Sequence, residues 1–225
     1  MSASELVDAK ATIDEEKAKA KRKAQRRAAL MRQMVKWHWI SAAICLVGML
    51  LFAITGITLN HAGAIEAKPN TVEAEGQLPA ELLSVAKAAQ AEQGALPDPI
   101  RVWLAKDMGV KAPKAAAIEW TDEEAYVSLP RPGGDGWVTF DVGTGAVVHE
   151  STSRGPVAYL NDLHKGRNAG AVWSLFLDVF AIGCVIFCLT GLVLLQLHSK
   201  ARKITWPLVG LGLAVPLILV LIFLH

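Results

Sequence analysis

Three long apolar runs constrain this chain more than any other feature of its sequence. They cover residues 39–59, 172–197 and 204–224, and Asp178 is the only charged residue in them. Each has about 20 residues or more, the length that a helix needs to cross a hydrocarbon core about 30 Å thick. The first run begins only at residue 39 and is longer than the apolar part of a signal peptide, which favours a retained span. The sequence therefore predicts an α-helical membrane protein with three transmembrane helices.

The distribution of charge predicts the orientation of these spans. Nine Lys or Arg residues lie in residues 17–36, and three more lie in the loop 199–203. Residues 61–168 carry ten basic and fifteen acidic residues, a net charge of −5. Because cytoplasmic loops are enriched in basic residues, the N-terminus and the loop 199–203 are placed in the cytoplasm. The predicted segments are a basic cytoplasmic segment (1–36), the first span (37–60), an exported domain (61–168), the second span (169–198), a cytoplasmic loop (199–203) and the third span (204–225).

The basic N-terminal segment is rich in Ala, Lys, Arg and Glu and predicts a solvated helix that runs into the first span. Attraction to anionic membrane lipid is the functional reading, worth roughly 1 kcal/mol for each basic residue near the surface. A topology signal and nothing more is the favoured interpretation of this segment, and nucleic-acid binding is a weaker alternative than lipid attraction. We expect membrane lipid, and no nucleic acid, as the partner of this segment.

The exported segment is long enough for one small domain. Residues 78–94 predict a helix, and residues 99–105, 115–120 and 124–129 predict strands. Residues 137–150 predict two more strands around a tight glycine-containing turn, so the domain is of the α+β type. It has no cysteine and no catalytic constellation, and His149 on its last strand is predicted to be a surface residue.

The first two spans share a phrase. Residues 55–63 read TGITLNHAG and residues 190–198 read TGLVLLQLH, and a glycine precedes each Thr by seven residues. Seven residues is about two helical turns, so the Gly and the Thr of each span lie on one helix face. Such small residues permit close approach of another helix or of a flat ligand.

Four histidines fall into two pairs under the predicted topology. His38 and His198 lie at the cytoplasmic ends of the first two spans, and His61 and His164 lie at their outer ends. Two imidazoles from facing helices are natural axial ligands for a haem iron that carries electrons. Zinc is the competing metal, but two histidines leave a tetrahedral ion short of ligands. We therefore expect one or two haem b groups, bound by His61 and His164 at the outer site and by His38 and His198 at the inner site.

Asp178 lies about two turns inside the second span, where an unpaired carboxylate is unfavourable by a few kcal/mol. One interpretation is that Asp178 accepts the ring N–H of His61 and fixes its tautomer. The alternatives are a hydrogen bond to Asn60 or Thr58, or an ion pair with Lys165 or Arg167. Asp178 and Asn60 are thus the candidate supporting residues of the outer site.

Three phrases resemble those of the PepSY-associated transmembrane helix proteins: HWISAAICLVGMLLFAITGITLNHAG, LHKGRNAG…WSLFLDVFAIG…LTGLVLL and FDVGTGAVV. The resemblance covers roughly residues 37–200. It implies a small α+β PepSY-like domain between helices one and two, and larger members include haem-containing inner-membrane reductases of ferric siderophores. By this resemblance His38, His61 and His164 match histidines of the family phrases, and His198 has no counterpart. Three spans, fewer than in those reductases, imply a homo-oligomer or a partner membrane subunit.

The function expected from these features is electron transfer through b-type haem in the bacterial inner (cytoplasmic) membrane. The donor would be a quinol or a separate redox enzyme, and the acceptor a ferric chelate or a periplasmic redox protein. A different class of function is a non-redox, membrane-anchored PepSY module that binds or regulates a partner protein. A third is an accessory subunit of a metal-uptake system.

The topology can be tested with reporter fusions. A reporter that is active only in the periplasm should be active when fused after residue 110 or after residue 225, because both positions follow an odd number of spans. It should be silent within residues 199–203. Activity in that loop would contradict the assignment of the histidines to two leaflets.

Overall fold

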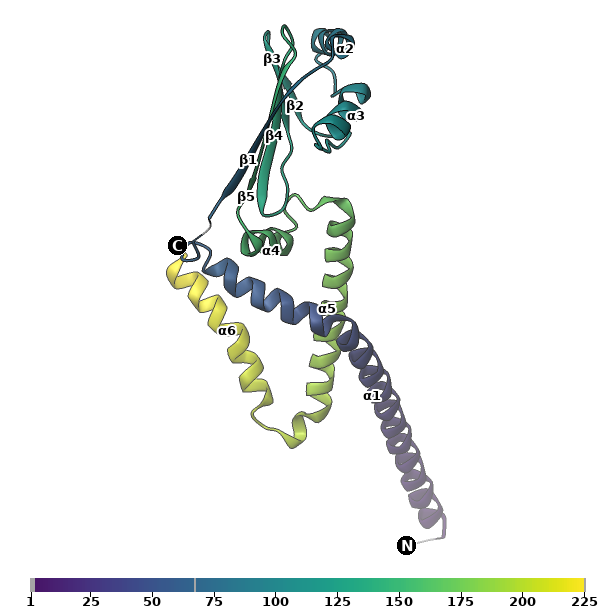
Figure 1. The fold of residues 1–225 in the computed structure, drawn as a ribbon. Coiled ribbons are helices and arrows are strands. Elements are labelled where there is room, and N and C mark those ends of the chain that lie inside the picture. The colour runs from purple at the N-terminus through teal and green to yellow at the C-terminus, as the bar shows by residue number, and fades with distance from the viewer. Residues whose placement is uncertain (1–2, 67, 225) are drawn as a thin grey trace. The chain divides into compact units, whose positions relative to one another are not determined.

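A computed structural model describes residues 3–66 and 68–224 (Figure 1). Four residues lie outside the described ones: residues 1–2 of the predicted cytoplasmic segment, residue 67 of the predicted exported domain and residue 225 of the predicted third span. The chain divides into two compact units, Leu50–Leu177 and the pair of segments Met1–Met49 and Asp178–His225. The helices are α1 (Ala3–Asn60), α2 (Ala80–Ala91), α3 (Asp98–Asp107), α4 (Pro156–Lys165), α5 (Gly170–His198), the short 3₁₀ helix η1 (Ser199–Ala201) and α6 (Thr205–Phe223).

Three of the described helices are long and apolar enough to span a membrane: the segment Thr12–Asn60 of α1, and the whole of α5 and α6. Their large apolar side chains are mostly exposed; Val172 is 85% exposed and Leu213 is 73% exposed. Exposure of so many apolar side chains would be unfavourable in water, whereas it is favourable in the hydrocarbon core of a membrane. A helix can lie there because it pairs its own backbone N–H and C=O groups. The predicted fold class, an α-helical membrane protein with a small domain between its first two spans, is therefore confirmed.

In the first unit, two glycines lie where α1 and α5 approach each other closely. A side chain at Gly48 would overlap the ring of Phe180, and a Cβ at Gly183 would lie 2.6 Å from the Sγ of Cys45. These are the two glycines that precede the repeated Thr-Gly phrases by seven residues. They serve helix packing, as small residues do between transmembrane helices.

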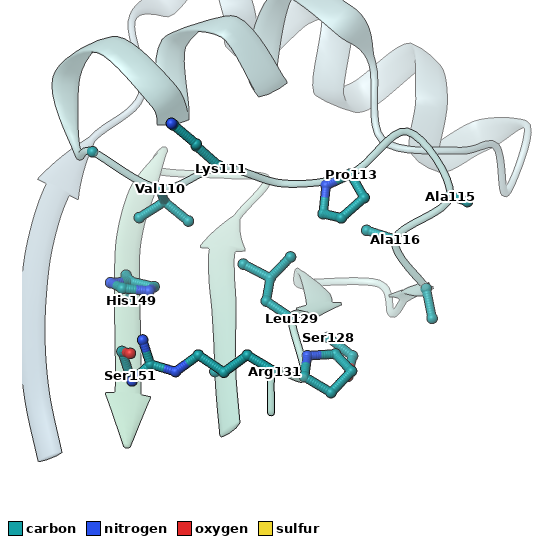
Figure 2. Close-up of a pocket in the computed structure, with 14 residues that line it drawn as sticks. Val110, Lys111, Pro113, Ala115, Ala116, Ser128, Leu129, Arg131, His149 and Ser151 are labelled. Atoms are coloured by element: carbon teal, nitrogen blue, oxygen red, sulfur yellow. The ribbon is translucent and has the colours of Figure 1, made fainter. Parts of the chain in front are cut away.

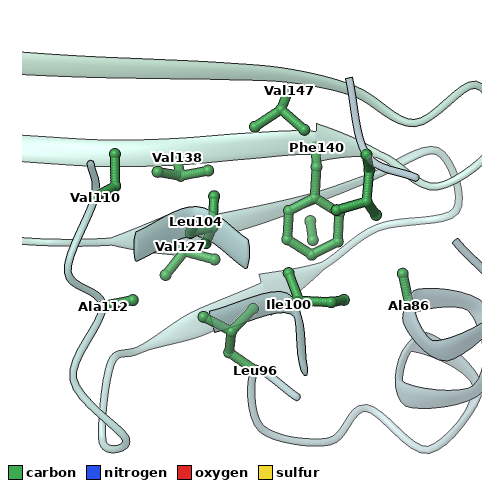
Figure 3. Close-up of a cluster of buried hydrophobic side chains, with 12 residues drawn as sticks. Ala86, Leu96, Ile100, Leu104, Val110, Ala112, Val127, Val138, Phe140 and Val147 are labelled. Carbon is green, nitrogen blue, oxygen red and sulfur yellow. The ribbon is translucent and has the colours of Figure 1, made fainter. Parts of the chain in front are cut away.

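The second unit contains an antiparallel sheet in the order β1-β5-β4-β3-β2. Figure 3 shows Ile100 and Leu104 of α3 packed against Val138, Phe140 and Val147 of the sheet, and all five are buried. Alternation along β3 and β4 sends every second residue to this core. The strands are β1 (Asn70–Gln77), β2 (Ile118–Trp120), β3 (Glu124–Ser128), β4 (Gly134–Asp141) and β5 (Ala146–Ser153).

The strand predicted at residues 99–105 is wrong, because these residues form helix α3. Val and Trp in this stretch favoured a strand. Two features favour the helix instead. Pro99 lies in the first helical turn, where a backbone N–H would have no partner in any case. Ile100 and Leu104 are four residues apart and both are buried, as on one face of a helix.

Strand β1 and helix α4 escaped the sequence analysis. β1 reads NTVEAEGQ and is mostly exposed, so it has no apolar alternation to reveal it. Its pairing with β5 instead holds it at the edge of the sheet. Helix α4 is only ten residues long and amphipathic, begins with Pro156 and ends at Gly166, which has φ of +68°.

The family-like phrase FDVGTG forms the turn between β4 and β5. The carboxylate of Asp141 accepts hydrogen bonds from the backbone N–H groups of Thr144 (2.6 Å) and Gly143 (2.8 Å). Bonds from Thr144, followed by the one from Gly143, hold the pKa of Asp141 below its ordinary value. Gly145 supplies the positive φ of +80° that closes the turn. This phrase is therefore a structural hairpin motif.

Candidate functional site

The imidazole of His38, on α1, is seated against helix α5. Its Nδ1 lies 3.2 Å from the carbonyl oxygen of Phe187 and 3.1 Å from Oγ1 of Thr190. The ring stacks on that of Phe187, with centroids 4.4 Å apart and planes inclined by 17°. A Cβ at Gly191 would lie 3.3 Å from Cε1 of His38 and would crowd the ring in this position. We call this arrangement the inner cradle.

A second imidazole is held in the same manner within the other unit. His164, on α4, has its Nδ1 2.7 Å from Oγ1 of Thr55. Its ring lies 4.9 Å from that of Phe52, at a tilt of 45°. A Cβ at Gly56 would come within 3.7 Å of its Cε1. We call this arrangement the outer cradle.

The two cradles use one five-residue motif, Phe-x-x-Thr-Gly, which occurs at residues 52–56 and 187–191. In each, the Phe ring lies beside the imidazole, Thr meets Nδ1, and Gly lies next to Cε1. A Cβ would crowd the ring at Gly191 but would be in ordinary contact with it at Gly56. The Thr-Gly pair and the room for a flat ligand were predicted from the sequence. The role of the Phe was not predicted, nor was the fact that the flat group is a histidine of the same chain. The recurrence of Phe three residues before each Thr was the available signal.

The hydroxyl hydrogen of each cradle Thr is already used by its own helix. Thr55 donates to the carbonyl of Leu51 (2.9 Å), and Thr190 donates to that of Ile186 (2.7 Å). For His38 the carbonyl of Phe187, which can only accept, assigns the proton to Nδ1. For His164 the same tautomer follows when Thr55 donates to its own helix and accepts from the ring.

The other two predicted ligands share this tautomer. His61 Nδ1 lies 3.0 Å from the carbonyl of Ile57, and His198 Nδ1 lies 2.8 Å from that of Leu194. A carbonyl can only accept, so both rings carry their proton on Nδ1. None of the four Nε2 atoms is hydrogen-bonded to a described residue. With the proton on Nδ1, the neutral form of each ring keeps on Nε2 the unshared electron pair that a metal ligand needs.

The structure brings the predicted inner pair together. His38 and His198 line one pocket of about 800 Å³ in the first unit, with apolar walls from α5. Arg202, on the connection to α6, also lines it. His38 is half-buried and His198 is exposed. This volume is in the range of about 300–1,000 Å³ that is usual for cofactor pockets.

The predicted outer pair is not gathered in this way. His164 lines a pocket of about 180 Å³ with Thr55, Trp173 and apolar residues, and His61 is absent from that lining. His61 is exposed at the end of α1. The outer cradle therefore holds one imidazole in a small apolar pocket, whereas the inner one offers two imidazoles to a large one.

Asn60 and Asp178, the predicted supporting residues, are both exposed. Asp178 makes no hydrogen bond or ion pair with a described residue of its own unit. Its predicted pairing with His61 stays a prediction.

Two neighbouring residues that the sequence analysis overlooked hold α4 in place instead. Buried Asn161 accepts a hydrogen bond from Thr58 (2.8 Å). Buried Asp162 accepts the N–H of Gly133 (2.8 Å) and pairs with Arg154 (3.2 Å). These bonds join α4 to α1 and to the sheet, and so position His164.

Among residues 3–66 and 68–224, no group of three or more His, Cys, Asp or Glu side chains could hold a metal ion. A haem iron differs from zinc here, because the macrocycle supplies four ligands and the protein supplies at most two. The inner pair fits that smaller requirement.

The fold and these sites define a class of protein: a three-span membrane protein with an α+β domain inserted between its first two spans and histidines seated on the spans. The model of the family described as "Putative PepSY_TM-like" matches residues 29–225. The chain therefore belongs to the PepSY_TM-like family, and the expected resemblance is confirmed at that level. Neither the curated proteins nor the solved structures gave a significant match.

The outer cradle can be tested by removing its hydroxyl. Thr55→Val should lower the free energy of unfolding by about 1–2 kcal/mol, because the Nδ1–H of His164 then loses its acceptor. Thr190→Val should have a smaller effect, since the carbonyl of Phe187 can still accept from His38. Chemical unfolding of the protein in detergent would measure both. Thr55→Ser, which keeps the hydroxyl, is the matched control, and equal losses in Thr55→Ser and Thr55→Val would contradict the role of the hydrogen bond.

Proposed function

We propose that this protein is a b-type haem protein of the bacterial inner membrane that passes electrons to a periplasmic acceptor. The observation that carries the proposal is the inner pocket, where two histidines line one apolar cavity of about 800 Å³ and both direct Nδ1 to a carbonyl of α5, which leaves Nε2 as the ligand atom of the neutral ring. When bound, haem supplies a one-electron couple. Everything else that the site needs comes from side chains of α1, α5 and the connection to α6.

The residues of the inner pocket fit the parts of a haem. His38 and His198 would hold the haem iron, each oriented by the bond that its Nδ1–H donates to a carbonyl of α5. Such bonds also raise the basicity of the ligating nitrogen. Arg202 would pair with a propionate, and Leu192 and Leu195 would contact the apolar macrocycle. Two imidazole ligands leave no open position for oxygen, which suits an electron carrier.

The direction of electron flow rests on the predicted topology. His38 and His198 lie at the predicted cytoplasmic ends of their spans, and the PepSY-like domain lies outside. A quinol or a separate redox enzyme would supply electrons, and a ferric chelate or a periplasmic redox protein would receive them. The outer pair, His61 and His164, would hold a second haem nearer the acceptor; in the described structure the cavity beside His164 has only about 180 Å³, so this second site requires the pocket to widen. A second copy of the chain or a partner membrane subunit would complete it.

A spectrum of the purified protein tests the proposal. Reduced-minus-oxidised bands of low-spin haem are expected for the wild type. His38→Ala and His198→Ala should each abolish the inner haem, and the double variant should be no worse, because the two ligands act as a unit. Cys184→Ala, on α5 but outside the pocket lining, is the control and should keep the spectrum. A folded but colourless wild-type protein would contradict haem binding and favour the non-redox alternative, a PepSY module that binds a partner protein.

The same measurement separates the two predicted sites. If the outer site holds a haem, His61→Ala and His164→Ala should each remove it while the inner haem stays. Asp178→Asn should then shift the reduction potential of that haem without losing it, if its carboxylate orients His61. Wild-type haem content in both outer variants would restrict the protein to the inner site.

A further inference from the structure

The exported domain has a pocket that electron transfer through the spans does not use. It has a volume of about 520 Å³ and lies between the loop 109–117, the end of β3 and strand β5 (Figure 2). This is the face of the sheet that carries the hydrophobic core. Val147, His149 and Ser151 follow one another on this face of β5, because alternate residues of a strand share a face. At this end of the sheet, polar side chains therefore take the core-facing positions that apolar side chains occupy at the other end.

Polar residues in core-facing positions need an explanation, since apolar residues normally occupy them. Val138 on the neighbouring strand is followed toward the same end by Gly136, which has no side chain to fill the space. A carbonyl, that of Leu129, would lie 3.1 Å from a Cβ at Gly136. The sheet thus opens a cavity at this end and lines it with hydrogen-bonding groups.

The charge of this pocket is opposite to that of the domain around it. Lys111, Arg131 and His149 line it, and no carboxylate does. Residues 61–168 as a whole have fifteen acidic and only ten basic residues. Because two cationic side chains and no carboxylate line it, the pocket has the electrostatic character of an anion site.

Arg131 is held in place but not neutralised. Its Nη2 donates to the carbonyl of Thr152 (3.2 Å), and in Figure 2 its side chain reaches β5 beside Ser151. It has no ion pair with a described carboxylate. Its remaining N–H groups are free to bind a planar oxyanion through two parallel hydrogen bonds.

His149 complements these cations without adding to their charge. Burial, followed by the nearby charge of Arg131, holds the pKa of His149 below its ordinary value. The ring is therefore neutral at pH 7 and can donate one hydrogen bond. The sequence analysis predicted a surface residue here, whereas the structure places His149 half-buried in the pocket wall.

We propose that this pocket binds a small organic oxyanion, with its carboxylate or phosphate group held by Arg131 and Lys111 and a second polar group contacted by His149 and Ser151. Its volume suits a small molecule. The proposal concerns the exported domain alone and does not depend on haem, so either can fail without the other.

Calorimetric titration of the full-length protein in phosphatidylcholine nanodiscs tests this site, with citrate and inorganic phosphate as probes. At least one of them should bind, and more weakly as salt is added. Tighter binding of citrate would identify a carboxylate ligand, and tighter binding of phosphate a phosphate ligand. Arg131→Gln should weaken binding tenfold or more, as expected when a charge-assisted hydrogen bond is lost.

The loop 109–117 offers a matched pair of variants. Lys111 lines the pocket and Lys114, three residues further along the exposed loop, does not. Lys111→Gln should weaken binding several-fold, and Lys114→Gln should leave it unchanged. The proposal is overturned if neither anion binds at millimolar concentration, or if Lys111→Gln and Arg131→Gln bind as the wild type does. Near-UV circular dichroism would verify that each variant is folded.

Discussion

One hydrogen bond, between a threonine hydroxyl of a span and Nδ1 of a histidine on a neighbouring helix, fixes the imidazole in each of this protein's two cradles. It occurs twice, between Thr55 and His164 and between Thr190 and His38. In an apolar environment an imidazole N–H without an acceptor is unfavourable by several kcal/mol, so the helix that supplies the acceptor determines where the ring lies. Each threonine first donates to its own helix, which leaves its oxygen as a pure acceptor. The tautomer, and with it the availability of Nε2, follows from this order of bonds.

Glycine has two distinct roles along the same helix faces. Gly48 and Gly183 allow α1 and α5 to pack closely, whereas Gly191 leaves room for an imidazole beside the backbone. The first role sets the separation of the helices, and the second gives a ring a fixed position on them. Since both roles need the absence of a side chain, the glycines alone cannot distinguish packing from ligand seating; the preceding Phe and Thr do.

The spans and the central α+β domain could be predicted from the sequence because they depend on properties of long segments. Apolar length, basic flanks and the alternation in residues 124–150 are summed over many residues, so single exceptions matter little. The pairing of His38 with His198 in one pocket was also within reach, since both histidines end spans that face each other. The partner of His164 was not, because it depends on α4, a ten-residue helix whose position is determined by Asn161 and Asp162. The helix at residues 98–107 was mistaken for a strand for a similar reason: β-branched composition is a local preference, and burial of Ile100 and Leu104 outweighs it.

The repeated cradle also has a consequence for comparing sequences. Its three fixed residues have separate steric or bonding roles, so few substitutions preserve all of them. Serine can replace threonine and another aromatic residue can replace phenylalanine, whereas a side chain at Gly191 would crowd the ring of His38. The motif Phe-x-x-Thr-Gly inside an apolar segment, together with a histidine at the end of a neighbouring helix, is thus a sequence signature that can be searched for in chains of unknown fold. In a chain that has the motif but no such histidine, the motif would serve helix packing alone. In a chain that has both, an imidazole is expected to lie against the motif.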